Sequence, residues 1–156
     1  MLDLGLLSWL RLSGGIRVER TLMDIRAQAG SALVDQVDLL PALSSVISFR
    51  TNFSLRLSYA GTVARPSFRE MAPISDYLPD VDLTADGNPN LQMSAITSYD
   101  ARLEWFPSTG EILSAGVFYK ALKYPIELYR VDFADSITWI NRAEATDEGR
   151  CLSVSG

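Results

Sequence analysis

The chain has 156 residues, of which 47% are hydrophobic and 21% charged, and its formal net charge at pH 7 is −5. This length leaves room for one domain, and an acidic chain without a basic run argues against nucleic acid as a partner. The chain contains no histidine and a single cysteine, Cys151, which excludes an intramolecular disulfide and removes the commonest metal ligand and general base.

The first ten residues are rich in leucine but have no basic region and no small-residue cleavage site, so they make a poor signal peptide. From residue 9 to residue 20, apolar and polar side chains alternate, which indicates a β-strand with one apolar and one wet face. The apolar set is Leu10, Leu12, Gly14, Ile16 and Val18. Residues 23–38 have no clean period and are expected to form a loop.

Further alternating segments follow along the chain, and most of them are long enough to be strands. They cover residues 39–49, 54–64, 98–105 and 111–123, and residues 137–141 could begin a sixth strand. In the segments 54–64 and 98–105, one face is apolar and the other carries Arg56, Arg102 and Glu104. A packed core would not accept such charges unpaired, whereas a sheet that is apolar outside and charged inside is typical of a transmembrane β-barrel.

The connections between these segments alternate in length. The long ones cover residues 23–38, 65–96 and 125–136, and the short ones cover residues 50–53 and 107–110. Outer-membrane barrels have short periplasmic turns and longer extracellular loops, so we expect the long connections to share the extracellular side. Strands of about ten residues, tilted by about 45°, would just cross the hydrocarbon.

Several motifs, in this order, resemble the TonB-dependent outer-membrane receptors. Residues 62–66 match the pattern T-x-A-R-P, residues 87–91 match G-N-P-x-L, residues 99–106 match Y-D-x-R-x-E-x-F, and residues 118–120 read F-Y-K. Residues 15–19 and 39–43 also look like segments of that family. The resemblance covers roughly residues 14–143, and its strength lies in the order of the motifs.

This resemblance implies a function for the whole receptor. Such a receptor binds a scarce nutrient (a siderophore, a cobalamin-like compound or a glycan) at the outer membrane of a Gram-negative bacterium and imports it with force transmitted by TonB. Large barrels of this kind have about 22 strands around a plugged lumen, so residues 1–142 would be part of one barrel. The plug and the TonB-contacting region are not among these residues, and we expect the chain to be an interior piece of a longer precursor. The resemblance implies no cofactor, and its partners would be outer-membrane lipid, TonB and the nutrient.

Substrate choice in that family lies in plug and loop residues. The sequence does not identify the ligand-binding residues; the candidates in the extracellular connection 65–96 are Arg69, Asp76 and Tyr77. After Asn141, a receptor would continue into a strand with the pattern G-x-E-x-E. Residues 143–156 do not match it, so we expect a divergent tail that is disordered or frameshifted.

Other residues suggest different sites, and each has a simpler interpretation. Asp80, Asp82, Asp86 and Asn88 resemble a calcium loop, but Ala85 and Leu91 stand where that loop needs glycine and glutamate, so a solvated acidic loop is expected and no metal. Arg56, Arg102 and Glu104 could form a catalytic pair with an anion site, but lumen charges paired across strands are the simpler interpretation. Cys151 has no histidine to activate it, so no catalytic residue is assigned. The aromatic residues are expected to form girdles at the two membrane interfaces; they are Trp9, Tyr59, Trp105, Tyr119 and Trp139.

The sequence therefore predicts an all-β protein built from antiparallel, up-and-down transmembrane barrel strands, here an incomplete curved sheet of five or six strands. It would form barrel wall and extracellular loops and would not be an enzyme. The alternative is a soluble small β-barrel that binds an apolar ligand inside, although its cavity would not carry a charged inner face.

Overall fold

The structure is a computed structural model, and it describes residues 2–27, 30–131 and 135–155. Most of these residues are in β-strands. The strands are β1 (Leu2–Leu7), β2 (Leu10–Ala27), β3 (Gly30–Arg50), β4 (Phe53–Ala64), β5 (Ser75–Leu78), β6 (Leu83–Asp86), β7 (Ser94–Trp105), β8 (Ile112–Lys123), β9 (Ile126–Arg130), β10 (Ser136–Asn141) and β11 (Glu144–Ser155), with one short helix, α1 (Phe68–Met71).

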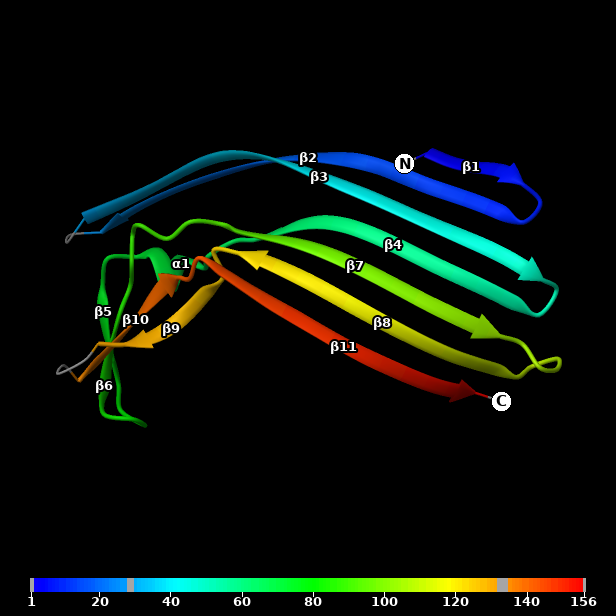
Figure 1. The fold of residues 1–156 in the computed structure, drawn as a ribbon. Helices are drawn as coiled ribbons and strands as arrows, with labels where there is room; N and C mark the ends of the chain where they lie inside the picture. Colours follow the sequence, from blue (N-terminus) through cyan, green and yellow to red (C-terminus); the bar gives the residue numbers. More distant parts are fainter. Residues whose placement is uncertain (1, 28–29, 132–134, 156) are drawn as a thin grey trace.

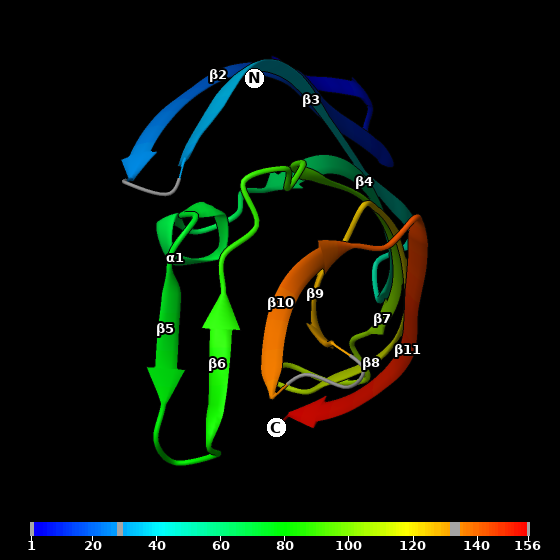
Figure 2. The same cartoon turned by 90° about the vertical axis from the view of Figure 1, so that its left-hand side faces the viewer.

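The strands form two sheets. The main sheet has seven antiparallel strands in the order β1-β2-β3-β4-β7-β8-β11, and the small sheet has four in the order β5-β6-β10-β9. The main sheet is long and curved (Figure 1), and the small sheet and α1 lie on its concave side at one end (Figure 2). The predicted fold class, an incomplete curved antiparallel sheet, is confirmed. The main sheet contains more strands than the five or six expected because β1 and β11 also join it.

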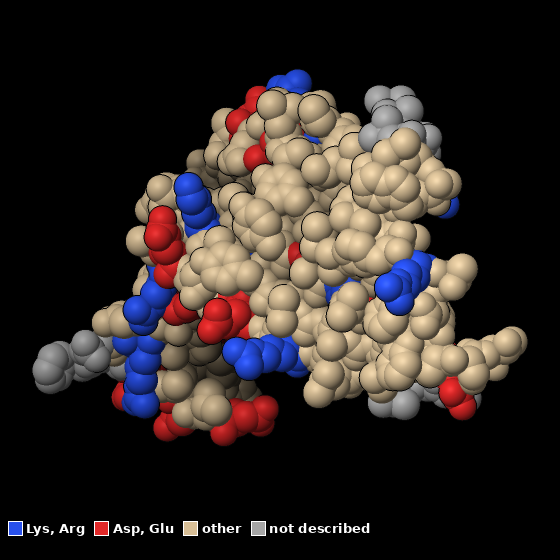
Figure 3. All heavy atoms as spheres, turned by 45° about the vertical axis from the view of Figure 1, so that its right-hand side comes forward, with Lys and Arg blue, Asp and Glu red and all other residues tan. Residues whose placement is uncertain are grey.

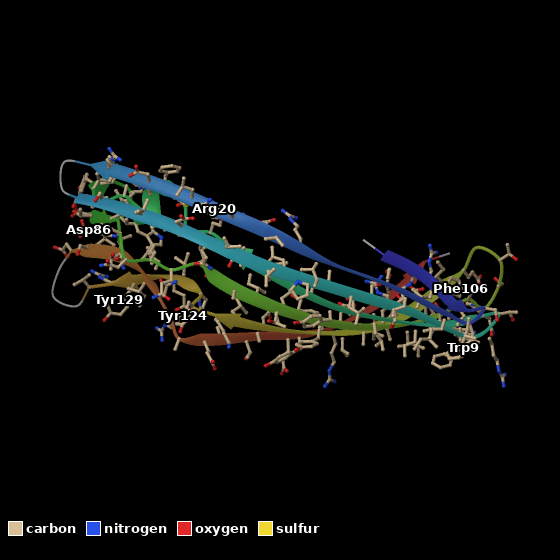
Figure 4. The ribbon with its side chains drawn as sticks, turned by 90° about the horizontal axis from the view of Figure 1, so that it is seen from above. Trp9, Arg20, Asp86, Phe106, Tyr124 and Tyr129 are labelled. Atoms are coloured by element: carbon tan, nitrogen blue, oxygen red, sulfur yellow. The ribbon has the colours of Figure 1, made fainter. Side chains whose placement is uncertain are left out.

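The two ends of the main sheet differ in their connections. The short turns after β1, β3 and β7 lie together at one end, and the long connections lie at the other (Figure 1). Trp9 and Phe106 mark the short-turn end, and Asp86, Tyr124 and Tyr129 mark the long-loop end (Figure 4). We call residues 65–93 the first rim loop and residues 124–143 the second rim loop. The first contains α1, β5 and β6, and the second contains β9 and β10.

The strand register places the alternating residues as the sequence predicts. Leu43, Tyr59, Tyr99 and Tyr119 are successive cross-strand partners, and they share the convex, outward face with Leu57. The rings of Tyr59 and Tyr99 lie 5.3 Å apart and those of Tyr99 and Tyr119 6.3 Å apart. Nearer the short turns, Phe53 stacks on Trp105 with 5.8 Å between ring centroids. Much of the surface in Figure 3 is accordingly uncharged.

The expected loop at residues 23–38 is wrong. β2 and β3 stay paired from Leu10↔Ile47 to Ala27↔Gly30, so these residues are a long hairpin that continues past the other strands. Within the hairpin the outward face changes from apolar to mixed, because exposed Leu22, Leu33 and Val37 share it with charged residues. Up to Val18 the outward side chains of β2 are apolar, but beyond it Arg20 faces outward and binds Asp35 of β3 through two hydrogen bonds of 2.9 and 2.8 Å.

Toward the tip of the hairpin, the inward side chains are apolar and are buried or partly buried. Ile25 and Ala32 form a buried cluster with Met71 of α1 and Leu91 of the first rim loop. Partly buried residues pack around that cluster; they are Met23, Val34, Ala72, Ile126 and Trp139. We call this set the rim cluster. Trp139, expected in an interfacial girdle, therefore lies in the rim cluster instead, because β10 belongs to the small sheet.

The C-terminal residues also differ from expectation. Residues 137–141 are a strand, but β10 pairs with β6 and β9 in the small sheet and does not continue the barrel wall. The strand that continues the wall is β11, which pairs with β8 from Glu144↔Lys123 to Ser155↔Ile112. A disordered tail was expected here. Its outward positions include Glu144, Glu148 and Arg150, so the apolar alternation that reveals the other strands is missing.

Among the residues that the structure describes, no helix has the length and apolar character needed to cross a membrane.

Candidate functional site

The first rim loop is fastened to the concave wall at its first residue. Arg65 Nε donates to Thr21 Oγ1 of β2 at 2.7 Å, and its Nη2 pairs with the Glu19 carboxylate, which also pairs with Arg17. Inward residues on neighbouring strands can form such pairs because alternate side chains share a face. The arginine of the T-x-A-R-P motif thus joins the base of the loop to a strand two positions away in the sheet.

A short capping motif then begins α1. The Ser67 side chain accepts from the Glu70 backbone N–H at 3.4 Å, and the Glu70 carboxylate accepts from the Ser67 backbone N–H at 2.7 Å. This reciprocal arrangement satisfies two N–H groups that the helix leaves free at its start. It turns Met71 into the rim cluster, where that side chain is 1% exposed, and leaves Phe68 at the start of the helix 65% exposed.

The G-N-P-x-L motif closes the first rim loop against α1 and the second loop. A Cβ on Gly87 would lie 1.8 Å from the Ala72 carbonyl oxygen, so no other residue fits there without moving the backbone. Asn88 donates from its backbone N–H to the Glu70 carbonyl oxygen at 2.7 Å and from Nδ2 to the Trp139 carbonyl oxygen at 2.9 Å. The motif therefore has a packing and bonding role at the rim.

The three predicted ligand-contacting residues lie close in the chain but make two separate pairs. Arg69 Nη2 donates to Asp76 Oδ2 at 2.9 Å, and the Tyr77 hydroxyl donates to Asp82 Oδ1 at 2.7 Å. Asp76 and Tyr77 are neighbours on β5, so their side chains point to opposite faces of the small sheet. The structure brings Arg69 and Asp76 together and places Tyr77 on the other face.

The contact with Asp82 changes the acidity of Tyr77. Ionisation of the phenol would break the hydrogen bond and bring a second negative charge next to the carboxylate, and this raises the pKa of Tyr77 above its ordinary value. At neutral pH, Tyr77 is therefore a neutral phenol whose proton is already donated within the loop.

The concave wall below the rim holds the charges considered for catalysis. Glu104 is largely buried; it accepts from Ser54 Oγ at 3.1 Å and from Arg56 Nε at 2.9 Å. Arg102 lies opposite Arg56 in the register of β4 and β7. The Arg56–Glu104 ion pair thus joins neighbouring strands, as expected for lumen charges.

Two further features bear on the site. In the described part of the chain, no group of three or more acidic or cysteine side chains is arranged to hold a metal ion. A groove of about 760 Å³ is lined by residues of the outward face, among them Leu57, Tyr59, Tyr99 and Ala101. Because the alternation assigns this face to hydrocarbon, the groove is not the candidate ligand site.

Sequence reasoning missed the residues that hold the two rim loops together. Asn141 bonds to Gln92 and Tyr124, and Thr138 bonds to the Asp86 carbonyl oxygen at 2.9 Å. Their partners are backbone atoms that lie far away in the sequence, at Gln92 and Asp86 of the first rim loop and at Tyr124 at the start of the second, so neither periodicity nor a short motif indicates them. The only signal was Asn88, which stands inside a recognisable motif.

A family model described as the outer membrane protein beta-barrel family matches residues 6–142. A search of curated proteins finds no match. Among solved structures, the siderophore receptor PirA from Pseudomonas aeruginosa has a TM-score of 0.78 at 15% identity, over 97% of this chain and 29% of that one.

Two other solved receptor structures are also similar to this chain. The hemophore receptor HasR of Serratia marcescens, solved with its hemophore HasA and heme, has a TM-score of 0.71 at 14% identity, over 94% of this chain and 29% of that one. The ferric enterobactin receptor PfeA from Pseudomonas aeruginosa has a TM-score of 0.71 at 16% identity, over 97% of this chain and 23% of that one.

At these identities the likeness shows the fold, and the chain spans less than a third of each receptor. The expected resemblance to outer-membrane receptor barrels is confirmed at that level. The family model covers most of the chain and its members are outer-membrane proteins, which gives the location as the cell outer membrane. The chain belongs to the outer membrane protein β-barrel family.

Proposed function

We propose that this chain forms wall and extracellular loops of a TonB-dependent receptor that binds a scarce nutrient and imports it into a Gram-negative bacterium. One observation carries the proposal: two long loops from different hairpins fold together on the concave side, at the end opposite the short turns. A barrel that only anchors or seals needs no such structure at one rim. The polar concave wall below the loops suits a filled or hydrated lumen.

An iron-carrying compound, siderophore or haem, is the substrate class that we place first, ahead of a cobalamin-like compound or a glycan. The support comes from the named ligands of the similar structures, a siderophore, ferric enterobactin, and a hemophore with heme. In this proposal, TonB supplies the force, and outer-membrane lipid covers the outward face.

Arg69, Asp76 and Tyr77 are the proposed ligand contacts. Arg69 uses one of its N–H groups on Asp76 and an arginine has five, so it can still donate to an anionic group of a ligand. Tyr77 is exposed and offers its ring and its hydroxyl oxygen. We expect these contacts to add affinity without doing chemistry.

The test is uptake by intact cells that lack the chromosomal copy and carry the full receptor on a plasmid. The probes are a panel of radiolabelled ferric siderophores, labelled haem, cyanocobalamin and a malto-oligosaccharide. Uptake of one iron compound that disappears when TonB is removed supports the proposal, and uptake of none of the four probe classes overturns it.

Variants then test the contacts. Loss of a charge-assisted hydrogen bond in Arg69→Ala should lower the apparent affinity about tenfold or more. Arg20→Ala is the matched control, because Arg20 makes a similar ion pair with Asp35 on the outward face. Equal loss of affinity in the two variants would argue against a ligand contact at Arg69.

A further inference from the structure

The two rim loops are joined at their bases by the side chain of Asn141. Its Nδ2 donates to the Gln92 carbonyl oxygen at 3.0 Å and to the Tyr124 carbonyl oxygen at 2.7 Å, and its Oδ1 accepts from the Gln92 backbone N–H at 2.7 Å. A side-chain amide has two N–H groups and one carbonyl oxygen, so all of its polar groups are engaged. One side chain thus bonds the end of the first loop to both ends of the second.

Tyr124, where the second loop leaves β8, is held in an uncommon backbone conformation at this junction. Its φ is 55°, in the left-handed region that a bulky residue rarely adopts. Its carbonyl oxygen accepts from Ser94 Oγ at 2.8 Å as well as from Asn141, and its N–H donates to the Ala143 carbonyl oxygen at 3.2 Å. Such a conformation persists where surrounding contacts determine it, which indicates that the junction is rigid.

Above the junction, the loops share a sheet. β10 of the second loop runs parallel to β6 of the first and pairs with it from Ser136↔Thr84 to Thr138↔Asp86. The Thr84 N–H donates to the Asp135 carbonyl oxygen at 2.9 Å, and Thr138 Oγ1 donates to the Asp86 carbonyl oxygen at 2.9 Å. Each of these bonds runs from one loop to the other.

The loops also share one apolar core. Met71 and Leu91 of the first loop are buried in the rim cluster, and Ile126 and Trp139 of the second loop pack against it. If either loop moved away alone, it would expose this surface and leave backbone groups of both loops without partners.

We propose that Asn141 is a positioning residue that couples the two rim loops, so that they open, close and contact a ligand as one body. Movement of the loops together keeps the bonds that run from one loop to the other, and movement apart breaks them. The coupling stands on the contacts alone, and only its consequence for ligand contact rests on the proposed function.

The first test is amide hydrogen exchange on the full receptor in lipid, without ligand. Asn141→Ala removes three hydrogen bonds, and exchange should rise by about tenfold or more in β6 as well as in β9 and β10. Ser75→Ala is the matched control, because it removes a bond to Asp86 within the first loop and should affect that loop alone. Faster exchange confined to the second loop in Asn141→Ala would overturn the proposal.

Asn141→Asp separates the two halves of the contact. A carboxylate keeps the acceptor for the Gln92 N–H but loses both donors. The protection factors in both loops, which correct for the intrinsic pH dependence of amide exchange, should fall to a level between the wild type and Asn141→Ala, and they should recover in part as the carboxyl is protonated at low pH. A purely local packing role for Asn141 would give no such recovery.

A cross-link distinguishes coupling from local support. Thr84→Cys and Ser136→Cys, made together with Cys151→Ser, place two thiols on the paired positions of β6 and β10 for a short bifunctional maleimide. Cross-linking should restore protection in Asn141→Ala, and in the wild-type background it should leave uptake intact. Protection that stays lost, or uptake that stops on cross-linking, would overturn the inference. A wild-type receptor that imports nothing would count against the proposed function alone.

Discussion

At the scale of single residues, a polar contact between two side chains of the rim changes the pKa of one of them. Tyr77 donates its hydroxyl to the Asp82 carboxylate at 2.7 Å, and this contact raises the pKa of Tyr77. The two residues flank the β5–β6 turn, with both side chains accessible to water, so removing the contact changes the titration without disturbing packing.

Asp82→Asn should therefore lower the pKa of Tyr77 toward the ordinary value of about 10. The amide can still accept the hydrogen bond, but it carries no negative charge to oppose ionisation. The measurement is the ultraviolet absorbance of tyrosinate during a pH titration of the full receptor, with Tyr77→Phe identifying the contribution of this ring. An unchanged titration in Asp82→Asn would show that the carboxylate does not set the pKa.

At the scale of elements, α1 is only one turn long and buries one side chain, that of Met71. Met71→Ala should destabilise the closed rim by about 2–5 kcal/mol, because it leaves a cavity in the rim cluster. Phe68→Ala is the control on the same helix, since that side chain is largely exposed. Amide exchange of the first rim loop measures the difference, and equal protection in the two variants would contradict the assigned faces.

The two faces of β4 make a second prediction at this scale. Leu57→Arg places a charge on the outward face near the middle of the bilayer and should cost about 2–4 kcal/mol. Ser58→Arg places the same charge on the concave face and should cost much less. Urea unfolding of the full barrel in lipid measures both, and equal penalties would refute the alternation.

Alternation in the sequence predicted the wall strands whose two faces meet the same surroundings along their whole length. It missed the segments in which the surroundings of a face change along the strand. Alternation found β4, β7 and β8 because hydrocarbon lies on one side and a polar lumen on the other along their whole length. In residues 23–38 apolar side chains lie on both faces. Ile25 and Ala32 point inward into the rim cluster, whereas Leu33 and Val37 are exposed on the outward face, so no single period describes the hairpin. In β11 the outward face is charged, and only pairing with β8 reveals a strand.

The candidate site was predictable only in part for a related reason. Arg65, Gly87 and Asn88 belong to motifs, and the structure gives each a bonding or packing role. Asn141 carries no such signal, because its partners, Gln92 of the first rim loop and Tyr124 at the start of the second, are far from it in the sequence.

At the scale of the whole molecule, the distribution of connections sets the orientation in the membrane. Protease added to intact cells should cut the full receptor in the exposed β5–β6 turn at residues 79–82 and spare the turn at residues 107–110. The first site lies at the rim and the second at the opposite end of the sheet. Cleavage that occurs only after the outer membrane is permeabilised would reverse the topology.

The first charged side chains on the outward face of the β2–β3 hairpin also limit how far the wall can move up or down in the bilayer. Val18 is the last apolar outward residue of β2 before Arg20, whose ion pair with Asp35 lies just beyond it. A shift of the wall toward the periplasm would draw this pair into hydrocarbon, where charge is costly. A shift outward would expose Ile16 and Val18 to water, at about 25 cal/mol per Å² of apolar surface. Vertical displacement of the wall is therefore opposed in both directions.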